Sequence, residues 1–147
     1  MSPQIVSFTR GEYAVSTDPA RLDIDAIHDF LHNVYWAQGR SRETVERSLR
    51  NSLGFGLYHS TRQIGLARII SDYTTYAYLC DVYVLDQYRG QGLGTWLIDC
   101  VMKHPDLQGL TRFSLVTRSA QALYRKFGFA EVTDPHRYMN LRRPDPG

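Results

Sequence analysis

The chain has 147 residues, of which 43% are hydrophobic and 22% charged, and its formal net charge is +2. This length and composition are those of one ordinary globular domain rather than of a disordered or membrane protein. Basic and acidic residues are mixed, and the absence of a basic stripe interleaved with aromatic residues argues against a nucleic-acid partner. We therefore expect a single domain over residues 1–147, with residues 142–147 as a frayed tail.

The sequence carries no sign of export or of a membrane partner. Its first ten residues lack the basic flank and apolar core of a signal peptide. No apolar stretch approaches the roughly 20 residues that span a bilayer. Cys80 and Cys100 stand in separate apolar runs without a C-x-x-C pair, which predicts reduced, buried thiols. We expect a cytoplasmic protein.

The first half of the chain predicts a strand followed by two helices. Residues 5–8, continued by residues 13–16, alternate as an opening strand does. Asp18 and Asp23 provide helix-capping carboxylates, and apolar residues then recur at a spacing of three and four up to residue 34. Ser41 caps a second, shorter helix that reaches residue 49.

The second half predicts strands first and crossover helices later. Residues 55–58, 64–70 and 76–84 have strand character, and the last of these runs is long, aromatic and β-branched. A helix over residues 93–103, a strand over 113–116, a helix over 120–127 and strands over 129–132 and 137–141 follow. This order predicts an α/β fold of the α+β mixed-sheet kind, with helices on the faces of the sheet.

A glycine-rich turn between the strand 76–84 and the next helix is the most informative segment. The glycines let the backbone approach a ligand closely, and the first amides of a helix form an anion site that suits phosphate. Arg89 adds an ionised fork for phosphate oxygens. The spacing fits neither a P-loop nor a Rossmann turn. The alternative is a turn whose glycines serve backbone geometry alone.

Two motifs resemble the GNAT acetyltransferase superfamily. Arg89-x-x-Gly92-x-Gly94 is similar to its Q/R-x-x-G-x-G/A signature, and Val82-Tyr83-Val84 looks like the strand that precedes it. About 30 residues later, residues 117–129 resemble the A-x-x-L-Y-x-K-x-G-F segment of that family. The resemblance implies the GNAT fold, a central, mostly antiparallel mixed sheet of six to seven strands flanked by about four helices.

The resemblance also implies a cosubstrate, acetyl-CoA, and no metal. The backbone of the strand would bind the pantetheine and polarise the thioester carbonyl, while Arg89 and the turn amides would hold the diphosphate. Thr117 stands where many relatives have Asn, and it can supply only part of the hydrogen bonding of an amide. The residues expected to bind acetyl-CoA are Val82, Val84, Arg89, Gly90, Gln91, Gly92, Leu93, Gly94, Thr95, Thr117, Ala120 and Tyr124.

Two residues are expected to be catalytic. Tyr124 matches the family tyrosine that acts as general acid on the departing thiolate, and a phenol with a pKa near 10 suits that role. The alternative is a tyrosine that only packs on its helix. Asp81, an acidic residue in an apolar strand, is a candidate general base or acceptor-binding group. Its position resembles a carboxylate of spermidine/spermine acetyltransferases. The alternative is a structural carboxylate paired with an arginine or with backbone.

The acceptor is expected at the connection between the first two helices. The resemblance implies acceptor recognition there, where Tyr35, Trp36, Gln38 and Arg40 stand. The pair Tyr35 and Trp36 could wall a pocket or offer a ring face to a cationic amine. An aromatic anchor at a helix end is the alternative. His28 and His32 lack the glutamate of a metalloprotease motif, so no metal is expected there.

These features together predict transfer of an acetyl group from acetyl-CoA to a primary amine of a small molecule, by direct attack in a ternary complex. A protein lysine or N-terminal acetyltransferase and a non-catalytic acetyl-CoA sensor stay open as alternatives. By analogy, strands near the C-terminus could pair across a homodimer.

Overall fold

The computed structural model describes residues 2–144 and contains one six-stranded sheet in the order β1-β2-β3-β4-β5-β6. All neighbouring strands are antiparallel except β5 and β6, which run parallel. The strands are β1 (Ser7–Arg10), β2 (Tyr13–Ser16), β3 (Leu53–His59), β4 (Arg62–Ser71), β5 (Tyr76–Val84) and β6 (Arg112–Leu115). The predicted mixed, mostly antiparallel sheet is confirmed.

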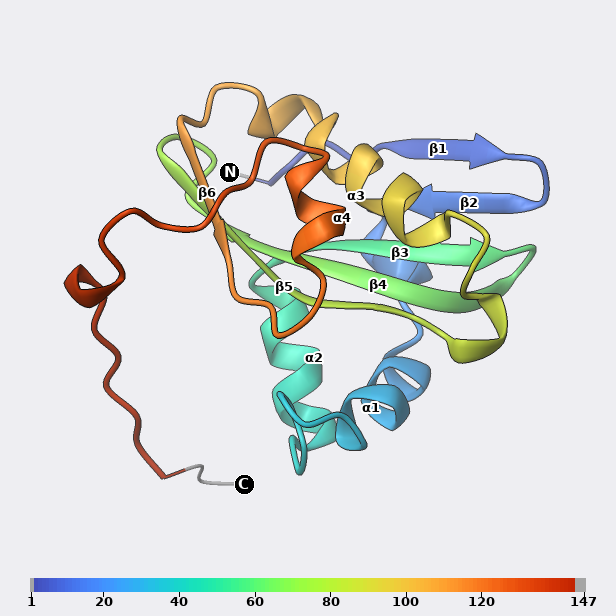
Figure 1. Cartoon of the computed structure of the whole chain (residues 1–147). Coiled ribbons are helices and arrows are strands. Elements are labelled where there is room, and N and C mark those ends of the chain that lie inside the picture. Colours follow the sequence, from blue (N-terminus) through green and yellow to red (C-terminus); the bar gives the residue numbers. More distant parts are fainter. Residues whose placement is uncertain (1, 145–147) are drawn as a thin grey trace.

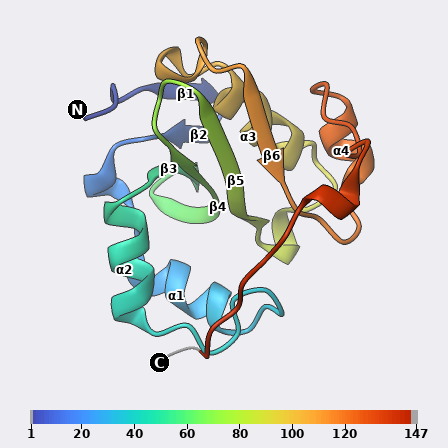
Figure 2. The same ribbon diagram turned by 90° about the vertical axis from the view of Figure 1, so that its left-hand side faces the viewer.

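Helices cover both faces of the sheet, as Figure 1 shows. The α-helices of the described residues are α1 (Ile24–His32), α2 (Arg42–Arg50), α3 (Leu93–Met102) and α4 (Gln121–Arg125). Residues of α3 and α4 pack with β3, β4 and β5 in one buried cluster, and residues of α1 and α2 pack with Leu66 and Tyr83 in a second. The molecule is therefore a three-layer structure (Figure 2). The middle of β4, residues 63–67, and the end of β5, residues 83–84, are buried on both faces.

The predicted capping residues Asp23 and Ser41 are the N-caps of α1 and α2. The Asp23 carboxylate accepts from the amide of Ala26 at 3.0 Å, and the Ser41 hydroxyl accepts from the amide of Thr44 at 3.1 Å. Such caps satisfy amides that have no partner inside the helix. The connection between α1 and α2 spans residues 33–41, and its Trp36 and Arg40 bond Asp81 of β5.

A bulge in β5 decides which face its last residues occupy. Arg68 of β4 pairs with Cys80 and Leu66 pairs with Tyr83, so β5 contains one residue more than β4 over this stretch. Asp81 takes up the extra residue with φ of 51°, in the left-handed region that few non-glycine residues adopt. The bulge exchanges the faces beyond it, so that Tyr83 packs with the α1–α2 cluster and Val84 with the α3 cluster.

Two strands expected at the C-terminal end are absent from the described chain, and this prediction was wrong. Residues 129–132 and 138–144 form no strand, and Pro135–Arg137 is a short 3-10 helix instead. Asp134 and Pro135 favour this turn, and the segment runs away from the sheet in Figure 1. β6 therefore pairs with β5 alone. In the predicted tail, residues 142–144 belong to no helix or strand, and residues 145–147 lie outside the described residues.

The opening strand and α4 also differ from expectation in extent. Two strands joined at Gly11, which has φ of 58°, replace the single opening strand. α4 spans Gln121–Arg125 rather than residues 120–127, and Gly128 follows with φ of 94°. No helix among residues 2–144 is both long and apolar enough to cross a bilayer.

Candidate active site

The two parallel strands part at the middle of β5. Their pairing ends at Leu79 and Leu115, while β5 continues for five residues to Val84. The backbone of residues 80–84 therefore bonds to β4 on one side and has no strand partner on the other within residues 2–144. An unpaired strand edge offers amide and carbonyl groups to a ligand. Val82 and Val84, two of the residues expected to bind acetyl-CoA, lie on this edge.

The glycine-rich turn places the start of α3 directly after that edge. Gly90 and Gly92 have φ of 80° and 79°, in a backbone region that strongly favours glycine. Gly92 is the N-cap of α3 and supplies no side chain to bond the first amides. The amides of Leu93, Gly94 and Thr95 therefore stand at the positive end of a ten-residue helix without a capping partner.

Neither a positive φ nor crowding by neighbouring atoms explains the glycine at position 94. Its φ is not positive, and a Cβ there would meet one side-chain atom of Val84 at 3.9 Å, an ordinary contact. The missing side chain instead leaves space in front of the helix terminus. Free amides, a positive dipole end and open space together fit a diphosphate.

Arg89 lies at this terminus but is engaged with its own loop. Its Nε donates to the carbonyl oxygen of Val84 at 3.1 Å, and its Nη1 lies 2.8 Å from Oδ1 of Asp86. The side chain is 59% exposed, so it can turn towards a bound anion at little cost. Gln91 is held by Tyr13, whose hydroxyl donates to Oε1 of Gln91 at 3.3 Å.

Tyr124 lies on α4 and is 7% exposed. Burial raises the pKa of its phenol above the usual value, so the hydroxyl stays protonated. The ring packs edge-on against Phe129, with 5.9 Å between the ring centroids. Nearby, the Thr117 hydroxyl accepts from the amide of Ala120 at 3.0 Å and thereby begins the turn into α4. The Thr117 hydroxyl thus accepts one hydrogen bond that stabilises the turn, and its own proton can be donated to a ligand.

On the opposite face, Asp81 is the centre of a buried polar cluster. Its Oδ2 accepts from Nη1 of Arg40 and from Nε of Arg68, each at 2.8 Å. Its Oδ1 accepts from the indole N–H of Trp36 at 3.1 Å. The Asp81 side chain is 2% exposed, and those of Arg40 and Arg68 are 20% and 12% exposed. The carboxylate thus fastens the α1–α2 connection to β5.

These contacts argue against Asp81 as the direct general base. A base must present a free oxygen to the acceptor amine within about 2.6–3.2 Å. Both Asp81 oxygens already accept charged or indole N–H groups, and the side chain is shielded from solvent. An amine could reach it only after the α1–α2 connection opened. The structure therefore favours the alternative, a structural carboxylate paired with arginine.

Tyr35 and Trp36 are brought to the same place. Trp36 is 40% exposed although its N–H is bonded to Asp81, and Tyr35 is 58% exposed. The two rings lie edge to face at 5.2 Å. The guanidinium carbon of Arg118, from the connection between β6 and α4, lies 3.8 Å from the centroid of the Tyr35 ring. These aromatic residues therefore link the α1–α2 connection to the segment that precedes Tyr124.

Comparison with known proteins decides the family. Residues 22–129 match the family model described as "Acetyltransferase (GNAT) family". The chain belongs to the GNAT acetyltransferases. A Gibberella zeae protein assigned to the acetyltransferases is 36% identical over 82% of this chain and 80% of its own. The thialysine N-epsilon-acetyltransferase of Mus musculus is 31% identical over 87% of this chain and 72% of its own.

A solved structure agrees with this assignment. The crystal structure of a GNAT-family protein from Xanthomonas campestris is 46% identical, has a TM-score of 0.86, and covers 90% of this chain and 94% of its own. The protein is therefore an N-acetyltransferase of a family that uses acetyl-CoA. The geometry of the unpaired end of β5 and of the uncapped terminus of α3 fits acetyl-CoA independently of these comparisons.

Sequence reasoning missed two residues of this region, Arg68 and Arg118. Arg68 has a signal that could have found it, because it is the one charged residue within the apolar run 64–70. A buried charge requires a partner, and Asp81 shows the same pattern in the next strand. Arg118 has no comparable signal, since a basic residue in a polar loop is ordinary.

Proposed function

We propose that this GNAT protein transfers the acetyl group of acetyl-CoA to a primary amine of a small molecule by direct attack in a ternary complex. The observation that carries the proposal is the junction of β5 and α3. There, an unpaired strand edge leads into a helix terminus with free amides and open space at Gly94. One ligand with both an amide-bearing arm and a diphosphate would satisfy both features.

The chain would hold this cosubstrate through the residues expected from the sequence. The amides of residues 91–95 and the Arg89 side chain would bind the diphosphate, and the edge at Val82 and Val84 would bind the pantetheine. Acetyl-CoA supplies the thioester whose acetyl carbon the amine attacks. Backbone amides of the β5 edge are fixed dipoles for the carbonyl oxygen, and such donors often provide the largest part of a rate enhancement.

Tyr124 is the proposed general acid. Its phenol donates a proton to the sulfur as the carbon–sulfur bond breaks and the carbon–nitrogen bond forms. The raised pKa keeps this proton in place at neutral pH. The surplus proton of the nitrogen passes to water, from which Tyr124 regains its own proton, because the Asp81 carboxylate is occupied by Arg40, Arg68 and Trp36. Asp81 is then a positioning residue that holds the α1–α2 connection.

The cysteines support direct attack rather than an acetyl-enzyme. Burial raises the pKa of Cys80 and of Cys100 to about 11 in each case, so both thiols are protonated at neutral pH. The thiolate is the nucleophilic form of cysteine, and neither residue is activated.

Two observations support a small-molecule amine as the acceptor: the name of one relative, and the aromatic pair Tyr35 and Trp36. The name of the mouse relative says that it acts on thialysine, an amine of low molecular mass. Tyr35 and Trp36 are both partly exposed, and since Arg118 already covers one face of the Tyr35 ring, Trp36 and the other face of Tyr35 are left for such a group. Acetylation of protein lysines or N-termini remains the second candidate. A cytoplasmic location and a homodimer remain predictions.

The experiment is thiol release from acetyl-CoA over a panel of amines. The panel contains thialysine, polyamines, amino sugars, arylalkylamines, amino acids and lysine peptides, with Tyr124→Phe as control. Turnover of one small-molecule class, strongly reduced in Tyr124→Phe, supports the proposal. Turnover of peptides alone replaces it with the protein-acceptor function, and saturable acetyl-CoA binding without any turnover replaces it with the sensor.

A further inference from the structure

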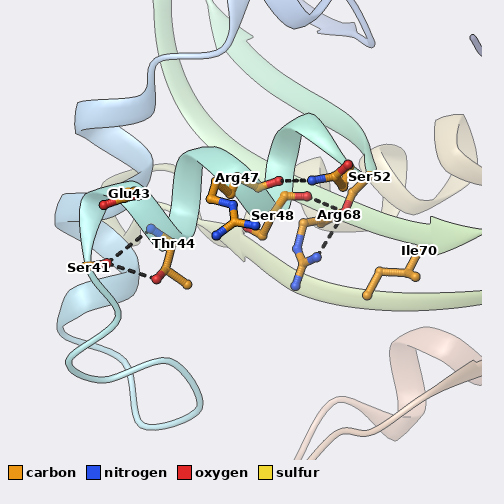
Figure 3. A pocket seen from close by; sticks show the side chains of 9 residues that line it. Ser41, Glu43, Thr44, Arg47, Ser48, Ser52, Arg68 and Ile70 are labelled. Atoms are coloured by element: carbon orange, nitrogen blue, oxygen red, sulfur yellow. Dashed lines mark hydrogen bonds between the residues drawn. The ribbon is translucent and has the colours of Figure 1, made fainter. Parts of the chain in front are cut away.

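An open groove of about 590 Å³ lies between α2 and the end of β4 (Figure 3). Its walls carry hydrogen-bonding side chains with few apolar ones, and those used below are Arg47, Ser48, Ser52 and Arg68. Arg68 connects the groove to the candidate active site, because the same guanidinium bonds Asp81 at the β5 bulge. A ligand group in the groove would therefore lie beside the α1–α2 connection.

The groove holds more positive charge than its own carboxylates neutralise. Arg40 and Arg68 share the single carboxylate of Asp81, so this cluster has one guanidinium in excess. Arg47 forms no ion pair with any residue of the described chain 2–144. Glu43 lies on the same wall and offsets one cation, which still leaves the Arg68 end positive.

The outer face of the same helix provides a contrast. There, Arg42 and Arg50 both pair with Glu46, at 3.1 and 3.0 Å. α2 thus neutralises its solvent face and leaves the arginine that faces the groove unpaired. Arg40 and Arg68 are largely buried and share one carboxylate, so an anionic ligand at the Arg68 end would offset the remaining positive charge.

Arg68 is held in a fixed orientation for such a ligand. Its Nε bonds Asp81 and its Nη1 bonds the hydroxyl of Ser52 at 3.0 Å. The Ser52 hydroxyl in turn donates to the carbonyl of Ser48 at 2.6 Å, which directs its lone pairs to Arg68. The remaining N–H groups of this fork have no bond within residues 2–144, and the side chain lines the groove in Figure 3. A fixed guanidinium fork matches the geometry of a carboxylate.

We propose that this groove binds the carboxylate of the acceptor, so that the substrate is a small amino acid acetylated on its distal amine. This inference rests on the proposed function and narrows its substrate class. Arg68 and Arg47 hold the carboxylate, while the aliphatic chain of the acceptor runs past the Asp81 bulge towards the β5 edge. The distance between the two ends of the acceptor then selects which of its amines reaches the thioester.

The first test compares an amino acid with its decarboxylated analogue. We measure kcat/KM for thialysine and for the diamine that lacks its carboxylate, in the wild-type protein and in Arg47→Gln. The wild type should prefer thialysine by tenfold or more, and Arg47→Gln should reduce that preference about tenfold, the scale of one lost charge-assisted contact. Arg47→Lys should keep most of the preference, and Arg50→Gln, on the outer face of the same helix, should keep all of it.

Equal kcat/KM values for the two amines in the wild type would overturn the inference and leave the proposed function standing. If neither amine is acetylated, the full amine panel decides on the proposed function, and a binding measurement decides on the groove. In the CoA-loaded protein, norleucine should shift the arginine Nε–H NMR signals of Arg47 and Arg68, and pentylamine, which lacks a carboxylate, should not. Unchanged arginine signals with norleucine would overturn the carboxylate site.

Discussion

Nε of Arg68 on β4 lies 2.8 Å from Oδ2 of Asp81 on β5, and neither side chain is more than 12% exposed. The pair forms across the bulge that turns Asp81 to the α1–α2 face. Trp36 and Arg40 bond the same carboxylate. The buried charge of Asp81 therefore joins β4 and β5 to the α1–α2 connection. Stability and acceptor binding should therefore change together when Asp81 is altered.

Replacing Asp81 by Asn leaves two largely buried guanidinium groups without a counter-ion. The free energy of unfolding should fall by about 3 kcal/mol, the lower part of the range for breaking a buried ion pair. KM for the acceptor should rise as the α1–α2 connection loses its anchor. Denaturant unfolding and steady-state kinetics measure the two effects, and Asp29→Asn on exposed α1 surface is the control. An unchanged stability with a loss of kcat of a hundredfold or more would instead restore Asp81 as the base.

Arg89→Gln should weaken acetyl-CoA binding. The substitution removes a charge from the α3 terminus, and a charge-assisted hydrogen bond contributes about 1.5–3 kcal/mol. KM for acetyl-CoA should therefore rise roughly tenfold or more, with KM for the amine little changed, and the effect should shrink at high salt. Lys103→Gln, beyond the other end of α3, should leave KM for acetyl-CoA at the wild-type value. An unaltered KM in Arg89→Gln would remove Arg89 from the diphosphate site.

The pH dependence of kcat follows from the burial of Tyr124. A general acid works in its protonated form, so activity is present below its pKa and is lost as the pH rises through it. Burial raises this pKa above its ordinary value of 10.0. The profile of kcat from pH 6 to about 9.5 should rise as the amine loses its proton. It should show no falling limb in that range.

Tyr124→Phe should lower kcat about a hundredfold or more across this pH range, since general acid catalysis typically contributes 10²–10⁴-fold. A falling limb near pH 8 that persists in Tyr124→Phe would assign the essential acid to another group.

Neither cysteine should be required for turnover. Both thiols have a pKa raised to about 11 by burial and are protonated during catalysis. Cys80→Ala and Cys100→Ala should each retain kcat/KM within a few-fold of the wild type. Mass spectrometry of the intact protein incubated with acetyl-CoA alone should show no acetyl adduct. An adduct that disappears in one of these variants would indicate a covalent acetyl-enzyme and exclude direct attack.

Gly65→Ala should destabilise the sheet next to the site. A Cβ at Gly65 would lie 2.6 Å from the carbonyl oxygen of Tyr83, and a backbone atom cannot turn aside. Overpacking of this kind costs about 1–3 kcal/mol, measured as a lower Tm and a lower denaturant midpoint. Gly109→Ala is the matched control, because a Cβ there meets nothing within 4 Å. Equal stability of the two variants would show that β4 and β5 can separate without cost.

The sequence by itself determined the features that depend on neighbours along the chain. Apolar spacing and the capping residues Asp23 and Ser41 predicted α1 and α2, and β-branched and aromatic runs predicted β3, β4 and β5. The glycine turn was found at its correct place before α3, because Gly90 and Gly92 have backbone conformations that other residues avoid. The two motifs also indicated the family from the sequence alone, because each is a pattern of residues close together along the chain.

Only the tertiary structure decided the features that depend on pairing between distant segments. The bulge at Asp81 is a mismatch in register between two strands, and no local pattern announces which residue will be the extra one. The partner of a buried carboxylate is chosen by packing, so Arg68 and Arg40 appeared only when the strands and helices were assembled. The predicted strands 129–132 and 137–141 had suitable residues, but a strand exists only where another strand bonds it, and β6 is the last strand of this sheet.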